Sequence, residues 1–551
     1  MRPLVFLLFT LLGLQGQVPR PTEVQERRLS NGIRVLWVER RNLTAFHATM
    51  VFRGGRAEEP LAVAGATDLL AGALFGASGP EDVENGKASK EWDTLLAQEE
   101  GLQEALRLAR LQPSPGSLSQ TSGLEASLQA VKARIQAHRS SAPLSDVYGA
   151  LGGWQRAEAT EDALMVHTEL PQEAFETWCR TEAQRLSILR LSRFSSAKEL
   201  LLAEARASGS QPLSLLREAA LPSHPYGRNL RDHLPALEAL RGSELRAYAR
   251  RALSPDRMAL IVVSGLDLNR LMPVLERHFG SLPTPPGPEA SLLPEVPPDL
   301  GDRRVQASLG SASCLLVGWR TPPRRQLDHL ALRLAAQILG GGRHSRLQTR
   351  LVGGKALAQR VELRMDVPGA RFAGLLVAEL FPAKGHSLEE LEAAVQNEVL
   401  RLQQEPISSE EWQRASAQLE VEYLLTLDEP AKLAAALGRS WAECGDWRQL
   451  DLEMQRLKAL SPEAVQAAVR TWLIPSHRTT VLLQPALVNT GDPLEARAAR
   501  VLQGLAALRV EDLAQREHLV TEGLRQLRML NPQERLRTLE LLEAQLLPGK
   551  Q

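Results

Sequence analysis

One segment of this chain occurs twice, and this repeat limits the folds that the chain can adopt. Residues 239–263 (ALRGSELRAYARRALSPDRMALIVV) align without a gap on residues 459–483 (ALSPEAVQAAVRTWLIPSHRTTVLL). Identical residues recur at Ala239/Ala459, Leu240/Leu460, Ala247/Ala467, Arg250/Arg470, Leu253/Leu473 and Pro255/Pro475. Each copy has the pattern of an amphipathic helix, a proline turn and a buried apolar strand. The repeat therefore predicts two similar units, each closed by a helix and a strand.

A proline-rich segment separates the two copies. Residues 282–299 contain seven prolines in eighteen positions, a composition typical of an extended, semi-rigid linker. The 551 residues are enough for three or four domains at about 150 residues each. We therefore expect an N-terminal domain over residues 22–281 and a C-terminal domain over residues 300–486.

Charge and the N-terminus suggest an exported protein without a nucleic-acid partner. The 65 basic and 65 acidic residues cancel, so no broad field favours nucleic acid or an anionic membrane. Residues 1–16 have one early charge at Arg2 and then an apolar run, as in a signal peptide. The run is too short to span a membrane. We expect a periplasmic or secreted protein, with an uncleaved anchor as the alternative.

Three cysteines lie far apart in the chain, at Cys179, Cys314 and Cys444. An odd number in an exported protein gives no disulfide framework. We expect buried thiols rather than a bridge.

Several short motifs, in a consistent order, resemble those of the M16 zinc peptidases (the pitrilysin, insulinase and mitochondrial processing peptidase family). They lie at residues 29–38, 51–60, 223–228, 263–267 and 337–347. The resemblance covers roughly residues 25–485. It implies an α+β fold with two homologous metallopeptidase-like domains, each an antiparallel sheet with helices packed on one face. It further implies that the two halves face each other across a chamber.

The zinc motif of that family is degraded in this chain. Family members carry His-x-x-Glu-His on a helix, where residues four apart lie on one face and grip one zinc ion. The glutamate acts as the general base. Here Asp68 stands at the first histidine position, Ala71 at the glutamate position and Gly72 at the second histidine position. Since Ala71 and Gly72 offer neither ligand nor base, we expect no catalytic residue at this motif.

One position of the family's metal site is retained. The third zinc ligand of the family is a glutamate on a later helix, and Glu204 matches it. Two carboxylates without imidazole make a poor zinc site, so we interpret Glu204 as a solvated or ion-paired helix residue. We expect no cofactor, although zinc is usual for the family.

Peptide binding is harder to exclude. The family holds its substrate as an added β-strand on an exposed sheet edge. The matching segment here is residues 152–160, in which Ala157 replaces the family's asparagine and Thr160 is retained. In the C-terminal half, Arg346 retains a family position and Gln359 replaces a tyrosine. We expect Arg346 to form an ion pair or a helix contact rather than to touch substrate.

Two helical segments extend the family pattern. Residues 90–138 have the pattern of a helical hairpin inserted after the degraded motif. Residues 493–548 form a helical tail in which Asn531 and Pro532 begin the last helix. We expect the tail to pack onto the body, with a docking surface for a partner as the alternative.

Together these features favour an exported, non-catalytic scaffold or regulatory subunit that pairs with a catalytically active M16 relative. One alternative is a stand-alone peptide-binding or structural module of the cell envelope. Another is an active metalloendopeptidase with a non-standard site. A neighbouring gene that encodes an intact His-x-x-Glu-His relative would favour the first over the second. Proteolysis by the purified single chain would favour the third.

Overall fold

The structure is a computed structural model, which describes eleven segments of the chain. They are residues 23–76, 87–111, 117–139, 143–207, 211–284, 301–308, 312–354, 356–485, 493–509, 513–530 and 532–544. The predicted signal peptide and most of the proline-rich linker lie outside these residues and stay predictions. Within the described part, no helix combines the length and apolar character that crossing a membrane requires.

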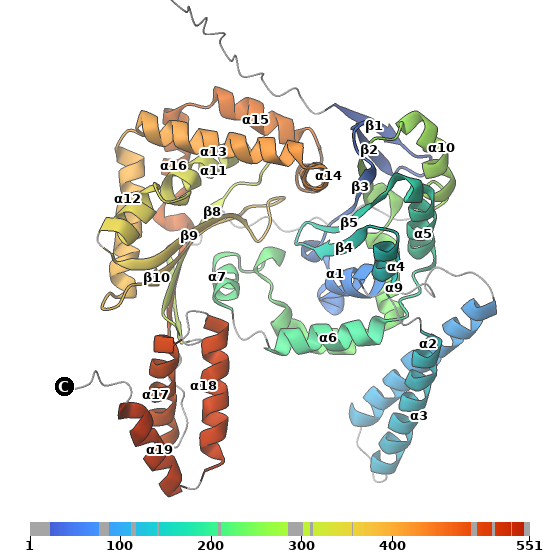
Figure 1. Ribbon diagram of the computed structural model, residues 1–551, viewed down its shortest axis with the longest axis horizontal. Coiled ribbons are helices and arrows are strands. Elements are labelled where there is room, and N and C mark those ends of the chain that lie inside the picture. Colours follow the sequence, from blue (N-terminus) through green and yellow to red (C-terminus); the bar gives the residue numbers. More distant parts are fainter. Residues whose placement is uncertain are drawn as a thin grey trace, which may run out of the picture.

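The N-terminal half contains a six-stranded sheet and its helices (Figure 1). Its strands are β1 (Val24–Arg28), β2 (Arg34–Glu39), β3 (Ala45–Arg53), β4 (Trp154–Ala159), β5 (Ala163–Pro171) and β6 (Met258–Ser264). Its helices are α1 (Ala66–Leu69), α2 (Lys87–Leu111), α3 (Ser117–His138), α4 (Leu144–Ala150), α5 (Phe175–Ile188), α6 (Phe194–Ala207), α7 (Pro212–Ala220), α8 (Leu234–Ala239), α9 (Gly242–Ala252) and α10 (Leu268–His278).

The C-terminal half contains a five-stranded sheet, and the tail follows it. Its strands are β7 (Arg303–Ser308), β8 (Cys314–Thr321), β9 (Ala358–Val367), β10 (Gly374–Pro382) and β11 (Arg478–Gln484). Its helices are α11 (Leu327–Gly340), α12 (Leu388–Gln404), α13 (Ser409–Asp428), α14 (Pro430–Cys444), α15 (Gln449–Ala459) and α16 (Pro462–Trp472). The tail helices are α17 (Pro493–Arg509), α18 (Leu513–Arg528) and α19 (Pro532–Ala544).

The two sheets have the same topology. The strand orders are β1-β2-β6-β3-β5-β4 and β7-β11-β8-β10-β9, so they match strand for strand once β1 is set aside. This confirms the α+β fold with two homologous domains. We expected antiparallel sheets. Each sheet instead contains one parallel pair, β2 with β6 in the first and β7 with β11 in the second. In each pair the second strand comes from the end of the domain and is inserted beside the first.

The sequence repeat coincides with the segment that supplies this inserted strand. The first copy forms α9, a short turn at Pro255–Arg257 and β6. The second copy forms α16, the turn Pro475–His477 and β11. Both inserted strands are central, with neighbours on either side. The nearly continuous apolar sequence of β6, MALIVVS, fits a strand that is covered on both faces. In β11 the apolar residues are confined to Val481, Leu482 and Leu483.

One face of the N-terminal sheet packs against helices of its own half. Trp37 and Leu260 share a buried cluster with Phe175 and Trp178 of α5 and with residues of α9 and α10. The rings of Trp37 and Phe175 meet edge to face at 5.7 Å, a favourable geometry for aromatic pairs. This face also carries the segment of the degraded motif.

The opposite face of the N-terminal sheet is covered by a helix from the C-terminal half. Helix α14 lies against β3, β5 and β6, and Val51 and Ile261 share a buried cluster with Leu433 and Leu437 of α14. The approach depends on Gly438, because a Cβ there would stand 2.6 Å from Cγ2 of Val51. We expected helices on one face of the sheet only. The second face is covered as well, by a helix of the other half.

The reverse contact covers the C-terminal sheet. Helix α7 of the N-terminal half lies against β7, β8 and β11. Leu216 of α7 packs over Gly318 of β8, where a Cβ would come within 3.1 Å of the leucine side chain. Both α7 and α14 begin with proline and precede their repeat copy, so they are equivalent helices. Each half thus donates the same helix to the other half's sheet.

The helical hairpin and the C-terminal tail each have a small hydrophobic core of their own. Trp92, Leu95 and Ile135 form the core of the predicted hairpin, α2 and α3. The hairpin is attached to α6, where Ser195 Oγ donates a hydrogen bond of 2.8 Å to Glu99. The buried cluster of the tail contains only tail residues, Leu505 among them. The tail therefore packs on itself, in contrast to the packing onto the body that we expected, and in the view of Figure 1 it lies below the C-terminal half.

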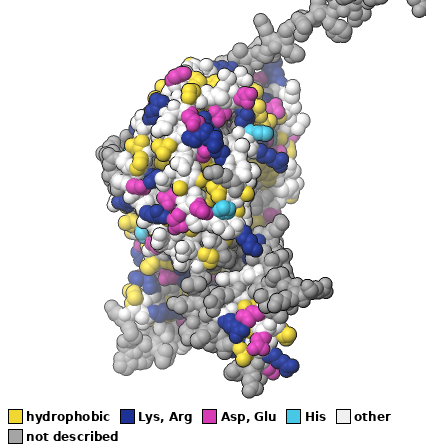
Figure 2. Space-filling model, turned by 90° about the vertical axis from the view of Figure 1, so that its left-hand side faces the viewer, with side chains coloured by type: hydrophobic (Ala, Val, Ile, Leu, Met, Phe, Trp, Pro, Cys, Tyr) yellow, Lys and Arg dark blue, Asp and Glu magenta, His cyan; other side chains and the backbone are white. Residues whose placement is uncertain are grey.

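The three cysteines are free thiols, as expected. Cys179 and Cys314 are buried and Cys444 is partly buried. On the face of the C-terminal half shown in Figure 2, basic and acidic side chains are interspersed. This mixture agrees with the balanced net charge and shows no single-sign field on that face.

We predict that Gly438→Ala destabilises the protein by about 1–3 kcal/mol, because the new methyl group overpacks the contact with Val51. Adding Val51→Ala should recover part of the loss. Gly101→Ala is the matched control: this helical glycine has no atom within 4 Å of its Cβ position, so the variant should be as stable or up to about 1 kcal/mol more stable. Denaturant unfolding measures all three, and an unchanged Gly438→Ala would contradict the interlocked packing.

Candidate functional site

The degraded motif lies on a helical segment whose start is held by a buried carboxylate. Gly65, with φ of 86°, precedes α1, and the chain continues as a π-helical turn over Leu70–Gly76. Glu59 accepts hydrogen bonds from the backbone N–H groups of Gly65 at 2.9 Å and Thr67 at 2.6 Å. These bonds satisfy amides that a helix start leaves without partners. Burial raises the pKa of Glu59 to about 7.

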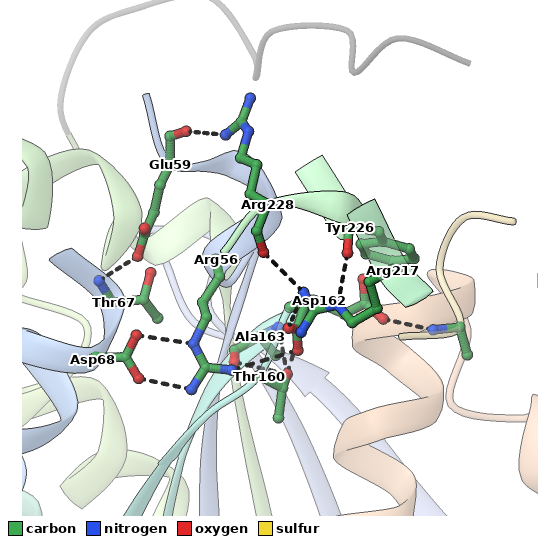
Figure 3. A network of polar contacts seen from close by, with 12 residues as sticks. Arg56, Glu59, Thr67, Asp68, Thr160, Asp162, Ala163, Arg217, Tyr226 and Arg228 are labelled. Carbon is green, nitrogen blue, oxygen red and sulfur yellow. Dashed lines mark hydrogen bonds and ion pairs between the residues drawn. The ribbon is translucent and has the colours of Figure 1, made fainter. Parts of the chain in front are cut away.

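The first histidine position of the family motif is occupied by one half of an ion pair. Asp68 accepts two hydrogen bonds from Arg56, from Nε at 2.9 Å and from Nη2 at 2.7 Å. Arg56 also reaches Glu161 at 3.4 Å, and Glu161 accepts from Arg217 at 3.1 Å. Figure 3 shows the pair of Arg56 and Asp68 in this network. The result is a chain of alternating charges at the position that we aligned with the family's first metal ligand.

The rest of the motif offers no donor atoms. Gly72 faces α6, where the nearest atom to its Cβ position is Cβ of Ala197. The π-helical turn also differs from the α-helix that we expected, since its i→i+5 bonds do not stack residues four apart as an α-helix does. Ala71, at the general-base position, is a half-buried apolar side chain. Asp68 and Gly72 are therefore not the ligand pair that the family spacing implies.

Glu204, the residue at the family's third ligand position, does not lie beside this segment. Helix α6 contacts the motif segment at Ala197 and, near Gly65, at Leu201. Glu204 lies three residues beyond Leu201 and is exposed. Among the residues that the structure describes, no group of three or more His, Cys, Asp or Glu side chains could hold a metal ion. The surroundings of Glu204 are those of a solvated helix residue.

The segment predicted to present a sheet edge does so. Strand β4 is the outermost strand of the N-terminal sheet, and Ala157 lies on it, half-buried. Thr160 follows the strand and closes the turn to β5: its hydroxyl accepts a hydrogen bond of 3.0 Å from the backbone N–H of Ala163. Among the described residues, no further strand pairs with the outer side of β4, and the Thr160 hydroxyl serves the turn.

The two predicted positions of the C-terminal half lie on other elements. Arg346 makes a bidentate ion pair with Glu411 at the start of α13, at 2.7 and 2.9 Å. This is the structural role that we expected for it. Gln359 is exposed on β9, the outermost strand of the second sheet. Of the four candidate peptide contacts, Ala157 and Gln359 therefore lie on the edge strands of two different sheets, whereas Thr160 lies in a turn and Arg346 in a helical segment.

Sequence reasoning missed a polar contact between the halves. The carboxylate of Asp162 accepts from the Tyr226 hydroxyl and from the backbone N–H groups of Ala370 at 2.9 Å and Arg371 at 3.2 Å. Glu58 pairs with both Arg257 and Arg371. Burial raises the pKa of Asp162. Tyr226 stood in a recognised motif at residues 223–228, but its partners come from distant parts of the chain.

The space beside the ion-pair chain is small. A cavity of about 50 Å³ is lined by Arg56, Asp68, Glu161, Arg217 and Arg228, among others. This is room for a few water molecules, not for a peptide.

Comparisons with known proteins agree with the resemblance inferred from the sequence. The sequence profile described as "Peptidase M16 inactive domain" matches residues 240–419, a range that does not include the motif positions. An uncharacterized zinc protease of Mycobacterium leprae is 24% identical over 271 residues. That match covers 48% of this chain and 59% of the relative, which is less than two thirds of the relative's length.

Several solved structures share this fold, and each match covers almost the whole length of the solved chain. A protease from Helicobacter pylori has a TM-score of 0.68 at 16% identity and covers 84% of this chain and 100% of its own. A peptidase M16 inactive domain from Pseudomonas fluorescens has a TM-score of 0.65 at 17% identity, covering 85% and 99%. A chain of Complex III2 from Candida albicans has a TM-score of 0.61 at 12% identity, covering 90% and 99%. These similarities show that the chain has the fold of these proteins.

We predict that Arg56→Ala destabilises the protein by about 1–3 kcal/mol, because it leaves the partly buried carboxylate of Asp68 without its partner. The double variant Arg56→Ala/Asp68→Ala should lose less than the sum of the single variants. Arg107→Ala is the control, since its pair with Glu104 is more exposed and should contribute less than about 0.5 kcal/mol. Additive single and double variants in denaturant unfolding would sink the assignment of this pair.

Proposed function

We propose that this chain, which is a relative of the M16 peptidases, is a non-catalytic scaffold or regulatory subunit that pairs with a catalytically active relative. The observation that carries the proposal is the ion pair between Arg56 and Asp68. A guanidinium there supplies the positive charge that a metal ion would bring, but it cannot polarise a water molecule for attack as a bound metal does. Ala71 cannot take a proton from such a water molecule.

The partner would contribute the chemistry, and this chain would contribute surfaces. Its additions to the shared core are the hairpin, α2 and α3, and the tail, α17 to α19. Both carry exposed leucines near their ends, at Leu108, Leu111 and Leu541. One solved structure with this fold is a chain of Complex III2, so the fold occurs inside a larger assembly. We propose that one of the additions contacts the active relative.

The proposed place of action is the periplasm or the exterior of the cell. The support is the sequence of residues 1–16, with an early arginine and a short apolar run. A periplasmic or secreted partner with an intact motif would share this compartment.

A second candidate is a stand-alone peptide-binding module. The observation that favours it is strand β4, which has no neighbour on its outer side within the described sheet. An extended peptide could add to it through main-chain hydrogen bonds, without any need for zinc. Both candidates share the fold but differ in whether a second protein is required.

An active peptidase with a non-standard site has less support. Burial raises the pKa of the Cys314 and Cys444 thiols to about 12, which disfavours a nucleophilic thiolate. Burial also lowers the pKa of His224 to about 4, and its Nδ1 already accepts from the Tyr226 backbone. The surroundings of these three side chains are typical of structural rather than catalytic groups.

The test uses the full chain with an active relative from the same organism. We expect a stable complex that buries on the order of 1,600 Å² and peptidase activity that depends on both chains. Deletion of residues 493–551, or replacement of residues 87–138 by a short Gly/Ser loop, should abolish or weaken complex formation in size-exclusion chromatography. The active partner with an inactivated His-x-x-Glu-His motif serves as the control for activity.

Either of two results would contradict the proposal. The first is that both variants stay folded and neither binding nor activity changes. The second is that the single chain cleaves peptides with no partner present. The first result would leave the stand-alone module as the leading function, and the second would favour the non-standard peptidase.

A further inference from the structure

A turn of the C-terminal half is held inside the N-terminal half. The turn joins β9 to β10 and comprises residues 368–373, which we call the clasp. Its backbone N–H groups at Ala370 and Arg371 donate to the carboxylate of Asp162 at 2.9 and 3.2 Å. The fit is close, because a Cβ at Gly369 would lie 2.5 Å from Oδ2 of Asp162. The clasp is therefore a specific contact between the halves.

The side chains of the clasp are also held by the N-terminal half. The ring of Phe372 meets the rings of His224 and Tyr226 edge to face, at 5.5 and 5.7 Å. The backbone N–H of Phe372 donates to the Tyr226 hydroxyl at 3.3 Å. The guanidinium of Arg371 pairs with Glu58. The clasp thus joins the C-terminal half to the segment that leads into the degraded motif.

The carboxylate that receives the clasp lies next to the ion-pair chain of the motif. Asp162 and Glu161 are neighbours in the turn between β4 and β5, and Glu161 accepts from Arg56 at 3.4 Å. The same turn is held to the segment of Arg56 by the backbone, since the N–H of Arg56 donates to the carbonyl of Thr160 at 3.0 Å. Arg56 in turn makes the bidentate pair with Asp68. One short turn therefore contacts both the motif and the clasp.

A second connection runs through Arg217. Its Nη2 donates to Glu161 at 3.1 Å, and its Nε donates to the backbone carbonyl of Tyr226 at 2.9 Å. The Tyr226 hydroxyl donates to Asp162, and in the view of Figure 3 Asp162 lies between Arg56 and Tyr226. Asp162 and Tyr226 are almost fully buried. Because a buried polar group that loses its partner is costly, these groups are constrained to move together.

We propose that the ion pair of Arg56 and Asp68 controls the opening of the clasp. With the pair formed, the turn that contains Glu161 and Asp162 is held in place and the clasp is closed. When the pair is broken, this turn loosens and the clasp opens at its backbone hydrogen bonds. Coupling between two sites is reciprocal, so opening of the clasp also weakens the ion pair. The device lies within the single chain and does not rest on the scaffold role.

Opening of the clasp does not require separation of the halves. Its residues belong to no helix or strand, and such segments open at a lower free energy than the sheets beside them. Helices α14 and α7 meanwhile cover the two sheets, so they keep the halves together. The device is a local change at one point of the contact.

The test measures amide hydrogen exchange of the full chain by mass spectrometry, with fragmentation to single residues. We expect Arg56→Ala to speed exchange at Ala370 and Arg371 at least about tenfold, within the usual range of coupling between two sites. Arg56→Lys keeps the charge but loses the planar fork, so its effect should be smaller. In the reverse direction, Asp162→Asn should speed exchange in the motif segment, at residues 65–70.

The matched control for lost stability is Leu275→Ala. It removes a fully buried side chain of α10 from an apolar cluster that includes no residue of the clasp, so its clasp should exchange like that of the parent. An unchanged clasp in Arg56→Ala would overturn the coupling. Equal acceleration of the clasp in Arg56→Ala and Leu275→Ala would mean that it opens only with the whole protein, and would overturn the device as well. Thermal unfolding checks that each variant is folded.

Discussion

The exchange of one helix between the two halves is the contact on which the rest of the structure depends. Each central sheet has two apolar faces, and its own half covers only one of them. The other face is buried by α14 or by α7 from the opposite half, at the close approaches over Gly438 and Gly318. Exposing either face would cost roughly 25 cal/mol for each Å² of apolar surface. The two halves therefore share buried apolar clusters and pack as one unit.

The segment that we aligned with the family's metal motif is held by packing and by ion pairs within its own half. The motif segment sits on the face that the N-terminal half covers by itself, and its apolar residues, Leu69 and Leu74 among them, join that core. At its polar side, Arg56 pairs with Asp68 and links through Glu161 to Arg217. Buried charges must be paired to be tolerated. The guanidinium meets that requirement for the carboxylate of Asp68.

The sequence predicted what local patterns can encode. The repeat located the helix, turn and strand of both halves, and the motif alignment pointed to the fold that the solved structures share. The replacement of motif residues at Ala71 and Gly72 stays a prediction. The ion pair of Arg346 was also foreseen in kind. The sequence did not predict that Arg56 pairs with Asp68, because Arg56 lies in a turn whose direction depends on packing. The exchange of α7 and α14, and the contact of Asp162 with Ala370, join residues that only the tertiary structure brings together. The sequence pattern also could not predict where Glu204 lies relative to the motif segment, since that position depends on how two helices cross.

The most direct test of the central claim is the zinc content of the full chain after incubation with zinc and removal of unbound metal by gel filtration. A site built from the Arg56–Asp68 pair, Ala71 and Gly72 predicts far less than one zinc per chain by elemental analysis, unchanged by Glu204→Ala. One zinc per chain in the parent protein, lost in Glu204→Ala, would show that the family's metal centre survives and would contradict the account.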